Sequence, residues 1–464
     1  MNKLFETNYD NSKRQFNNIR NVNLPKENYR DIIVRFNTAE DMNLFMSKLN
    51  ISFSKTDLEY WYKPIGKQKT SALFDTKRIT IKFEPKTNSV WEEYCGMPEY
   101  ITTDSYGYHK ILVHFNCKED VDDFCTKLDY SITDKTRSIW FPKQPVNSEL
   151  DYVYHTTEDV QPHFPIYVIS KGRWDTSYTV KNLKWMNIKT YFVIVEEEEY
   201  KNYAKYIEKE HLLILDKKFQ KEYQTLDADG DALGLPVGSG AARNFAWEHS
   251  IKLGYERHWI MDDNIYGFYR LNKNRPYRVQ SGAFFRAMED FVCRYENVVM
   301  AGPQYKMFIP SKDYRYPLQW NCRIYSCNLI KNDIPFRWRC RYNEDTDLSL
   351  NILKAGYSTL LFVPFLQDKA VTQSVKGGNT GTIYTVGTKL KSEALARLHP
   401  DVTEVVYKYN RVHHYVNYSK FKNNKPILKE NITIPEDGTN EYSMQLDFTG
   451  DTVNQCHNPW PEDL

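Results

Sequence analysis

Two acidic segments hold residue types that could move a group from a diphosphate donor to an acceptor. Residues 262–264 (Asp-Asp-Asn) follow the strand-like run 258–261, and residues 344–347 (Glu-Asp-Thr-Asp) precede a leucine stripe that ends at Gly356. Carboxylates at the end of a strand can hold Mg²⁺ or Mn²⁺ beside phosphate oxygens. A carboxylate at the start of a helix can accept the proton of an attacking hydroxyl. Together the two segments predict a group-transfer site.

The first segment has two interpretations. Asp262, Asp263 and Asn264 could place one or two carboxylates on a divalent cation, which would neutralise charge on a departing diphosphate. Asp and Asn also favour turns, where their side chains bond to nearby backbone groups. The triplet alone does not decide between a metal platform and such a turn.

A predicted anion site precedes this strand. Arg243 opens a helix behind Gly238-Ser-Gly240. Glycines allow the backbone to approach a ligand, and a helix N-terminus beside a guanidinium favours an anion. The alternative is that Arg243 is a surface residue paired with Glu248.

In the second segment, Asp345 is the predicted general base, a role that typically contributes 10²–10⁴-fold to a rate. Asp347 is the second candidate catalytic residue, with the predicted role of capping the helix or positioning the site. Acidic residues are common at helix starts for dipole reasons alone. Further on, Lys376-Gly377-Gly378 could close over a diphosphate, although a plain glycine turn explains it nearly as well.

The elements that position these residues read as an α/β fold. From Pro165 onward, short apolar strands near 166–170, 191–195, 212–216 and 258–262 alternate with helices. This pattern predicts a Rossmann-type, mostly parallel sheet covered on both faces. Ligands of such sheets bind at the carboxyl ends of the strands. The polar residues there are Ser170, Lys171, Arg173, Glu196, Asp216 and the 262–264 triplet.

The N-terminal part contains an internal repeat. Val34-Arg-Phe36, an acidic pair and Trp61 recur as Val113-His-Phe115, an acidic pair and Trp140, each 79 positions later. The copies, at about 31–64 and 110–143, predict two βαβ-type units with helices capped by Asn37 and Asn116. The repeated tryptophans either fill the core or form a docking face or a stacking surface for unpaired bases. The predicted organisation is a repeat module at 1–145, a linker at 146–164, a catalytic domain at 165–425 and an acidic tail at 426–464.

Composition narrows the class of protein. The chain has 464 residues, of which 41% are hydrophobic and 15% aromatic, and a net charge of +2. Its apolar runs are too short to span a bilayer and no leader pattern opens it, so we expect a cytoplasmic protein without a membrane partner. Eight cysteines without a Cys-x-x-Cys pair favour reduced thiols over a zinc site. Basic clusters at 305–343 and 407–429 are candidates for contacts with nucleic acid.

Residues 165–420 resemble the TET-associated glycosyltransferases of bacteriophages, which are GT-A-type enzymes, because the motifs follow one another in the same order. The resemblance lies in the loop Ser170-Lys171-Gly172-Arg173, the Arg243-Asn244 helix, the Trp259-to-Asp263 strand and the Lys376-Gly377-Gly378 loop. It implies that Asp262 and Asn264 bind the metal and that Asp345 is the base. Asn264 stands where many relatives have a carboxylate, which puts tight metal dependence in doubt. The implied donor-binding residues are Ser170, Arg173, Glu196, Arg243, Asp263, Lys376, Gly377 and Gly378.

The resemblance further implies transfer from a UDP-sugar to 5-hydroxymethylcytosine in double-stranded phage DNA, with inversion, in the host cytoplasm. The sugar stays open, glucose and arabinose included. A polysaccharide or protein acceptor is the alternative, and a non-catalytic phage DNA-binding protein is a third interpretation. The candidate DNA contacts are Arg315, Arg323, Arg337, Arg339, Arg341, Arg411, His413 and His414.

Overall fold

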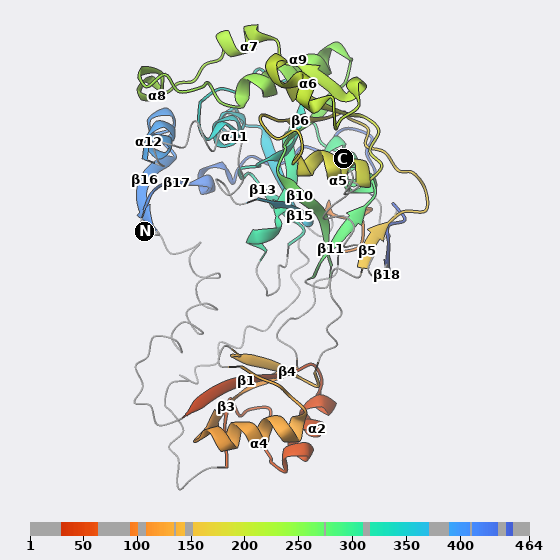
Figure 1. Ribbon diagram of the computed structural model, residues 1–464, viewed down its shortest axis with the longest axis vertical. Helices are drawn as coiled ribbons and strands as arrows, with labels where there is room; N and C mark the ends of the chain where they lie inside the picture. Colours follow the sequence, from red (N-terminus) through yellow and green to blue (C-terminus); the bar gives the residue numbers. More distant parts are fainter. Residues whose placement is uncertain are drawn as a thin grey trace. The chain divides into compact units, whose positions relative to one another are not determined.

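The computed structural model describes residues 29–63, 93–100, 108–133, 136–143, 152–272, 275–309, 316–370, 389–408, 411–434 and 442–448 (Figure 1). The chain divides into two compact units, one formed by Met1–Phe83 with Asp104–Val146 and the other by Glu84–Thr103 with Asn147–Leu464. Arg315 and the Lys376-Gly377-Gly378 loop lie outside the described residues. Within those residues, no helix has the length and apolar character needed to cross a membrane.

The smaller unit is a four-stranded sheet with two helices. Its sheet order is β2-β3-β1-β4, with β1 and β3 antiparallel in the centre. β2 pairs with β3 and β4 pairs with β1, both in parallel. The two strands of each sequence copy therefore do not pair with each other, which differs from the βαβ-type unit expected. The elements are β1 (Arg30–Phe36), α2 (Ala39–Leu49), β2 (Glu59–Tyr62), β3 (His109–Phe115), α4 (Lys118–Leu128) and β4 (Ser138–Phe141).

The repeated tryptophans take equivalent places in this sheet. Trp61 lies opposite His114, and Trp140 lies opposite Arg35, so the two pairs are related by the 79-residue spacing. Both tryptophans are partly exposed and lie outside the phenylalanine-rich core of the unit. Core filling is therefore the wrong interpretation of these two residues, whereas base stacking stays a prediction.

The helix caps differ from the predicted ones by one residue. Thr38 caps α2, because its hydroxyl accepts from the Asp41 N–H while the Asp41 carboxylate accepts from the Thr38 N–H. Cys117 precedes α4 and makes no side-chain cap bond. Asn37 and Asn116, the predicted caps, lie one position too early.

The larger unit is built around a twelve-stranded sheet. Strands β8-β7-β6-β9 are parallel neighbours, as predicted. Beyond β9 the sheet is mixed, because β14 and β10 run antiparallel to both of their neighbours. The short β10–β11 connection requires antiparallel pairing. The strands of the parallel half are β6 (Ile166–Ile169), β7 (Tyr191–Val195), β8 (Leu212–Ile214) and β9 (Arg257–Asp262).

The sheet continues from β9 in the order β14-β12-β15-β10-β11-β5-β18, and β13 pairs with β15. β5 lies in the predicted linker and β18 in the predicted acidic tail, so both segments contribute strands to the sheet. These strands are β14 (Cys327–Lys331), β12 (Val298–Tyr305), β15 (Ser358–Lys369), β10 (Ile265–Asn272), β11 (Arg275–Gln280), β5 (Tyr152–His155), β18 (Gln445–Phe448) and β13 (Leu318–Trp320).

Side chains alternate between two cores, one on each face of the sheet. In β6, Val168 joins one buried cluster and Tyr167 the other. Because strand side chains alternate between faces, helices must cover both sides. The larger cluster includes residues of α5 and α10, and the smaller one residues of α9 and α11. The helices are α5 (Tyr178–Trp185), α6 (Tyr200–Tyr203), α7 (Lys217–Lys221), α8 (Ala228–Ala232), α9 (Gly240–Lys252), α10 (Ala283–Cys293), α11 (Glu344–Lys354) and α12 (Lys389–Leu398).

A separate hairpin follows α12 and packs against it (Figure 1). Its strands, β16 (Thr403–Lys408) and β17 (Arg411–Val416), are antiparallel and form a two-stranded sheet of their own.

Candidate active site

A cavity of about 470 Å³ opens at the carboxyl ends of β6, β7 and β9. β6 has β7 on one side and β9 on the other, with Ile169 paired to Asp262. The chain moves outward from β6 to β7 and β8 and returns to the opposite side at β9. A reversal of this kind leaves a crevice at the carboxyl ends of the strands, where α/β proteins bind ligands. Polar lining residues include Ser170, Lys171, Arg173, Glu196, Ser239, Arg243, Asp262, Asp263, Asn264, Tyr305, Arg323, Ser326, Glu344, Asp345, Lys369 and Lys391.

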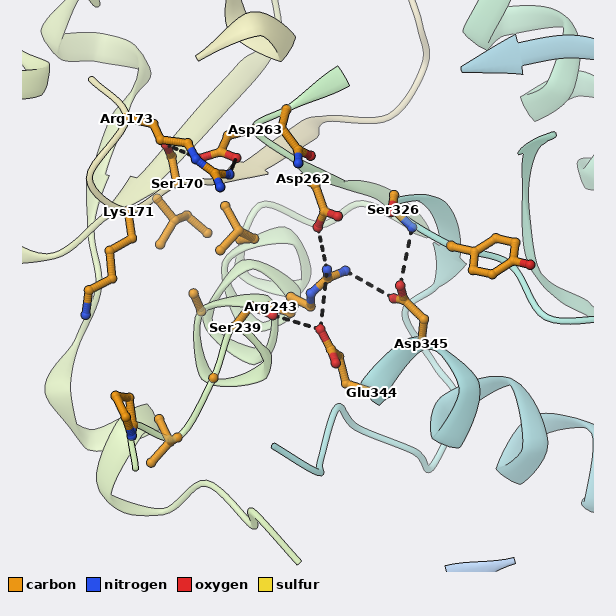
Figure 2. Close-up of a pocket in the computed structure, with 18 of the residues that line it drawn as sticks. Ser170, Lys171, Arg173, Ser239, Arg243, Asp262, Asp263, Ser326, Glu344 and Asp345 are labelled. Atoms are coloured by element: carbon orange, nitrogen blue, oxygen red, sulfur yellow. Dashed lines mark hydrogen bonds and ion pairs between the residues drawn. The ribbon is translucent and has the colours of Figure 1, made fainter. Parts of the chain in front are cut away.

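One guanidinium joins the two acidic segments inside this cavity (Figure 2). Arg243 Nη2 donates to Asp262 Oδ1 at 2.7 Å, and Nη1 donates to Asp345 Oδ1 at 3.3 Å. The strand end at Asp262 and the helix start at Asp345 are therefore brought together, as the sequence predicted for the two segments.

Arg243 is held rigidly by its surroundings. It lies in the first turn of α9, is 1% exposed, and stacks over Trp338 at 4.7 Å. A side chain at Gly240, in the same turn, would place Cβ 1.8 Å from the Tyr223 hydroxyl, so this approach requires glycine. The alternative pairing of Arg243 with Glu248 is wrong, since Arg243 lies inside the cavity.

Asp345 lies in the cavity at the start of α11, with 17% of its side chain exposed. Its Oδ2 accepts from the Ser326 backbone N–H at 3.3 Å, in addition to the Arg243 contact. Burial raises the pKa of Asp345 to about 6, with Arg243 acting in the opposite direction. A carboxylate with a pKa near neutrality is suited to accept a proton and to release it again.

Glu344 is a member of the site that sequence reasoning did not single out. Its Oε1 accepts from the Ser239 hydroxyl at 2.8 Å and lies 3.8 Å from Arg243 Nη2. The signal was present in the sequence, because Glu344 directly precedes the predicted base at the same helix start.

Asp347 does not line the cavity. Its carboxylate accepts from Arg339 Nε at 2.9 Å and lies 2.8 Å from His399 Nε2, and Asp347 itself is fully buried. Arg339 and His399 belong to segments before and after α11, so Asp347 holds the helix against both of them. The prediction of Asp347 as a catalytic residue is corrected on this ground.

The Ser170–Arg173 loop is engaged with Asp263. Ser170 Oγ donates to Asp263 Oδ2 at 2.7 Å, and Arg173 Nη1 forms a very short ion pair with Asp263 Oδ1. Lys171 Nζ pairs with Glu196 at 2.7 Å. All five residues line the cavity, as the strand-end argument predicted.

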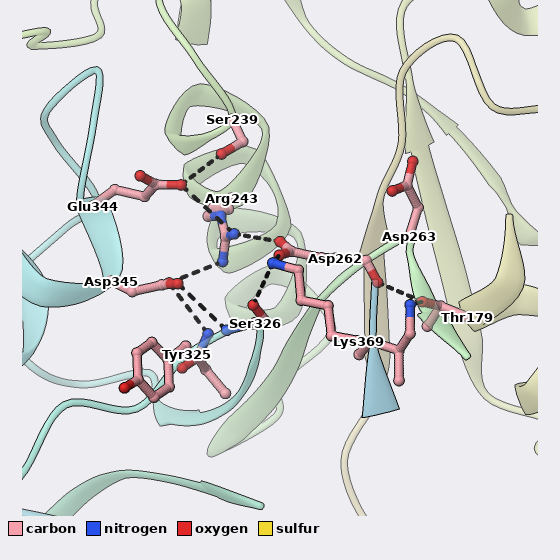
Figure 3. Close-up of polar contacts among 12 residues, drawn as sticks. Thr179, Ser239, Arg243, Asp262, Asp263, Tyr325, Ser326, Glu344, Asp345 and Lys369 are labelled. Atoms are coloured by element: carbon pink, nitrogen blue, oxygen red, sulfur yellow. Dashed lines mark hydrogen bonds and ion pairs between the residues drawn. The ribbon is translucent and has the colours of Figure 1, made fainter. Parts of the chain in front are cut away.

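Lys369 is the most consequential residue that sequence reasoning missed (Figure 3). It is the last residue of β15, and its Nζ lies 2.5 Å from Asp262 Oδ2 and 2.7 Å from Ser326 Oγ. Burial alone would raise the pKa of Asp262, but Lys369 and Arg243 hold it below its usual value. The missed signal was a charged residue at the end of a largely apolar strand, β15.

Among the described residues, the candidate DNA contacts do not form one surface. Arg341 is 2% exposed and pairs with Asp227 and Asp231, so it cannot reach a phosphate. Arg339 pairs with Asp347. Arg337 lies over Trp247 at 4.6 Å and is partly exposed.

The other candidates have different places. Arg323 lines the cavity instead of an outer surface. Arg411 is exposed on the β16–β17 hairpin, and His413 and His414 are partly buried there. A basic run in sequence did not translate into a basic face, because several of its arginines neutralise buried or nearby carboxylates.

The predicted metal platform fits poorly with these contacts. Both oxygens of Asp262 already accept from cationic groups, and both oxygens of Asp263 accept from Arg173 and Ser170. Asn264 Oδ1 is buried and has no hydrogen-bond partner among the described residues. The part of the chain that the structure describes contains no group of three or more His, Cys, Asp or Glu side chains able to hold a metal ion. Its seven cysteines are free thiols.

Comparison with known families gives one match. The model of the TET-Associated Glycosyltransferase family matches residues 164–378. The matched interval begins just before β6 and ends after β15, so it contains both acidic segments, Arg243 and Lys369. No curated protein matches the chain.

Proposed function

We propose that this chain, which carries a domain of the TET-associated glycosyltransferase family and is therefore a glycosyltransferase, moves a sugar from a UDP-sugar to 5-hydroxymethylcytosine in phage DNA. The observation that carries this proposal is the Arg243 bridge between Asp262 and Asp345 within one cavity. A GT-A-like fold is part of the proposal, supported by the parallel half of the sheet.

The proposed reaction inverts the anomeric carbon. Asp345 takes the proton of the acceptor hydroxymethyl group, whose oxygen bonds to C1 of the sugar. The bond from C1 to the β-phosphate oxygen breaks, and the electron pair leaves with UDP. Asp345 is suited to this step because it lines the cavity and its pKa is raised toward neutrality. The proton later returns to solvent from Asp345.

The surroundings of the cavity favour a nucleic-acid acceptor over other polymers. α12 contributes Lys391 to the cavity and packs on the β16–β17 hairpin. On this hairpin, Tyr407 is 71% exposed and Tyr415 is 47% exposed, beside the exposed Lys408 and Arg411. Basic side chains contact phosphates and exposed aromatic rings stack on bases.

A 5-hydroxymethyl group faces the major groove of duplex DNA, so it is less hidden than the Watson–Crick edge. Flipping of the base into the cavity is nevertheless part of the proposal, because Asp345 lies inside the cavity and an enzyme must bring the reacting atom to its base.

A product assay tests this function. The protein is incubated with hydroxymethylated DNA and, separately, with each member of a panel of sugar nucleotides, and the nucleosides are then analysed by mass spectrometry. We expect one donor to add the mass of one sugar to hydroxymethylcytosine, and unmodified cytosine DNA to stay unchanged. The absence of any sugar–nucleoside product with every donor would contradict the DNA acceptor.

Salt dependence separates the alternative acceptors. Binding to DNA should weaken steeply between 50 and 200 mM salt, because counterions are released from phosphates. Transfer to a neutral polysaccharide or a protein should lack this steep dependence.

A further inference from the structure

The carboxylate predicted to bind a metal is already neutralised by two side-chain cations. Arg243 Nη2 donates to Asp262 Oδ1 at 2.7 Å, and Lys369 Nζ donates to Asp262 Oδ2 at 2.5 Å. Arg243 cannot easily withdraw, since it is stacked on Trp338 and bonded to Asp345. A divalent ion on Asp262 would have to displace Lys369 and lie close to a fixed guanidinium of the same sign of charge.

Lys369 keeps hydrogen-bonding capacity for a ligand. An ammonium group has three N–H donors, and the described contacts of Lys369 use Asp262 Oδ2 and Ser326 Oγ. The third N–H is available to a phosphate oxygen in the cavity. Lys369 can therefore stay on Asp262 and still bind an anion.

A second cation of the cavity has no carboxylate partner within the described residues. Arg323 Nη1 donates to Thr346 Oγ1 at 3.1 Å, and Nη2 donates to the Tyr325 hydroxyl at 2.7 Å. Both acceptors are neutral, so they orient the guanidinium without cancelling its charge. Thr346 directly follows Asp345, which places Arg323 beside the proposed base.

From these contacts we infer that Lys369 and Arg323, instead of a divalent metal ion, neutralise the diphosphate of the donor. This inference rests on the proposed function for its donor class. When the bond to C1 breaks, negative charge grows on the β-phosphate, and the two cations stabilise it there. Preorganised cations of this kind stabilise a leaving group without moving during the reaction. Donor binding and transfer then need no metal ion.

The test is calorimetric titration of the full-length protein with UDP, GDP, ADP and TDP, in EDTA and in Mg²⁺ or Mn²⁺. We expect one diphosphate to bind in EDTA with a Kd within about threefold of its value with metal. Lys369→Met and Arg323→Met should each weaken this binding at least tenfold in EDTA, about 1.4 kcal/mol. Lys369→Arg keeps the positive charge, so this variant should bind the diphosphate with most of the wild-type affinity.

Lys306→Met is the matched control. Lys306 forms an ion pair at 3.0 Å with Asp368, the residue that directly precedes Lys369. Lys306 does not line the cavity. Its replacement should leave the Kd unchanged. Unfolding curves of each variant show whether it is folded, and if Lys369→Met does not fold, the comparison of wild-type protein in EDTA and in metal still decides.

Binding of the diphosphate only when metal is present would overturn this inference while leaving the proposed transferase function intact. An unchanged Kd in folded Lys369→Met and Arg323→Met would also overturn it. Failure of every diphosphate to bind in both buffers would overturn the proposed donor class, and the inference with it.

Discussion

Arg243 Nη1 lies 3.3 Å from Asp345 Oδ1, inside a cavity where the same guanidinium also contacts Asp262 at 2.7 Å. This relationship makes the two acidic segments depend on one another. Glu344 also lies 3.8 Å from this guanidinium, so Arg243 is close to three carboxylates. Without the guanidinium, less positive charge would offset the repulsion among Asp262, Glu344 and Asp345. Arg243 is thus both a structural and an electrostatic link between α9, β9 and α11.

Replacing this link should damage stability as well as activity. Arg243→Met is expected to lower the free energy of unfolding by about 3–5 kcal/mol, because partly buried carboxylates lose their buried cationic partner. Urea denaturation measures the loss. Arg337→Met is the control, since Arg337 also stacks on a tryptophan but is partly exposed, and it should lose less than about 1 kcal/mol. Equal losses in the two variants would contradict the linking role.

Asp345→Asn should separate chemistry from donor binding. The amide keeps the shape of the side chain but cannot accept the proton, so kcat should fall by about 10²–10⁴-fold. The Kd for the nucleoside diphosphate, measured by calorimetry, should stay within a few-fold. Glu344→Gln, at the neighbouring position, should lower kcat much less. A near-normal kcat for Asp345→Asn would place the base elsewhere or indicate a retaining reaction.

The pH profile should report the same group. The pKa of Asp345 is raised to about 6, and only its charged form can accept a proton. The rate should therefore be level above this value and fall about tenfold per pH unit below it. Single-turnover rates between pH 5 and 8, with circular dichroism confirming the fold at each pH, measure this limb. Lys306→Met, which leaves the cavity intact, should show the same profile, and a rate independent of pH across this range would exclude Asp345 as the base.

Sequence reasoning located this site through strand ends. Short apolar runs marked β6, β7 and β9, and the rule that ligands bind at carboxyl ends selected Ser170, Glu196 and Asp262, all of which line the cavity. The converging acidic segments were likewise predictable, because each had a recognisable helix or strand beside it.

Contacts between residues far apart in the sequence were harder to predict. Arg341 belongs to a basic run in the sequence, but its charge is matched by Asp227, more than a hundred residues earlier. No local pattern reveals such a partner. The same limit hid Lys369, whose contact with Asp262 depends on how β15 is placed relative to β9, across β12 and β14. Sheet order beyond the parallel half was unpredicted for the same reason.

Asp347 provides the last test, because its environment separates a structural carboxylate from a catalytic one. Arg339 and His399 lower its pKa against the opposing effect of burial, so the charged form is stabilised in the folded protein. Such a group stabilises the fold above its unfolded pKa, and this contribution is lost as pH falls through its lower folded pKa.

Asp347→Asn should therefore lower the free energy of unfolding by about 3 kcal/mol at pH 7, since Arg339 and His399 lose a buried partner. The difference from wild type should shrink as the pH falls below 4. Urea titrations at pH 7 and at several pH values below 4 measure this change, and the Kd for the donor diphosphate should stay unchanged in the folded variant. If Asp347→Asn were as stable as wild type but unable to transfer sugar, the carboxylate would have to act in the reaction after all.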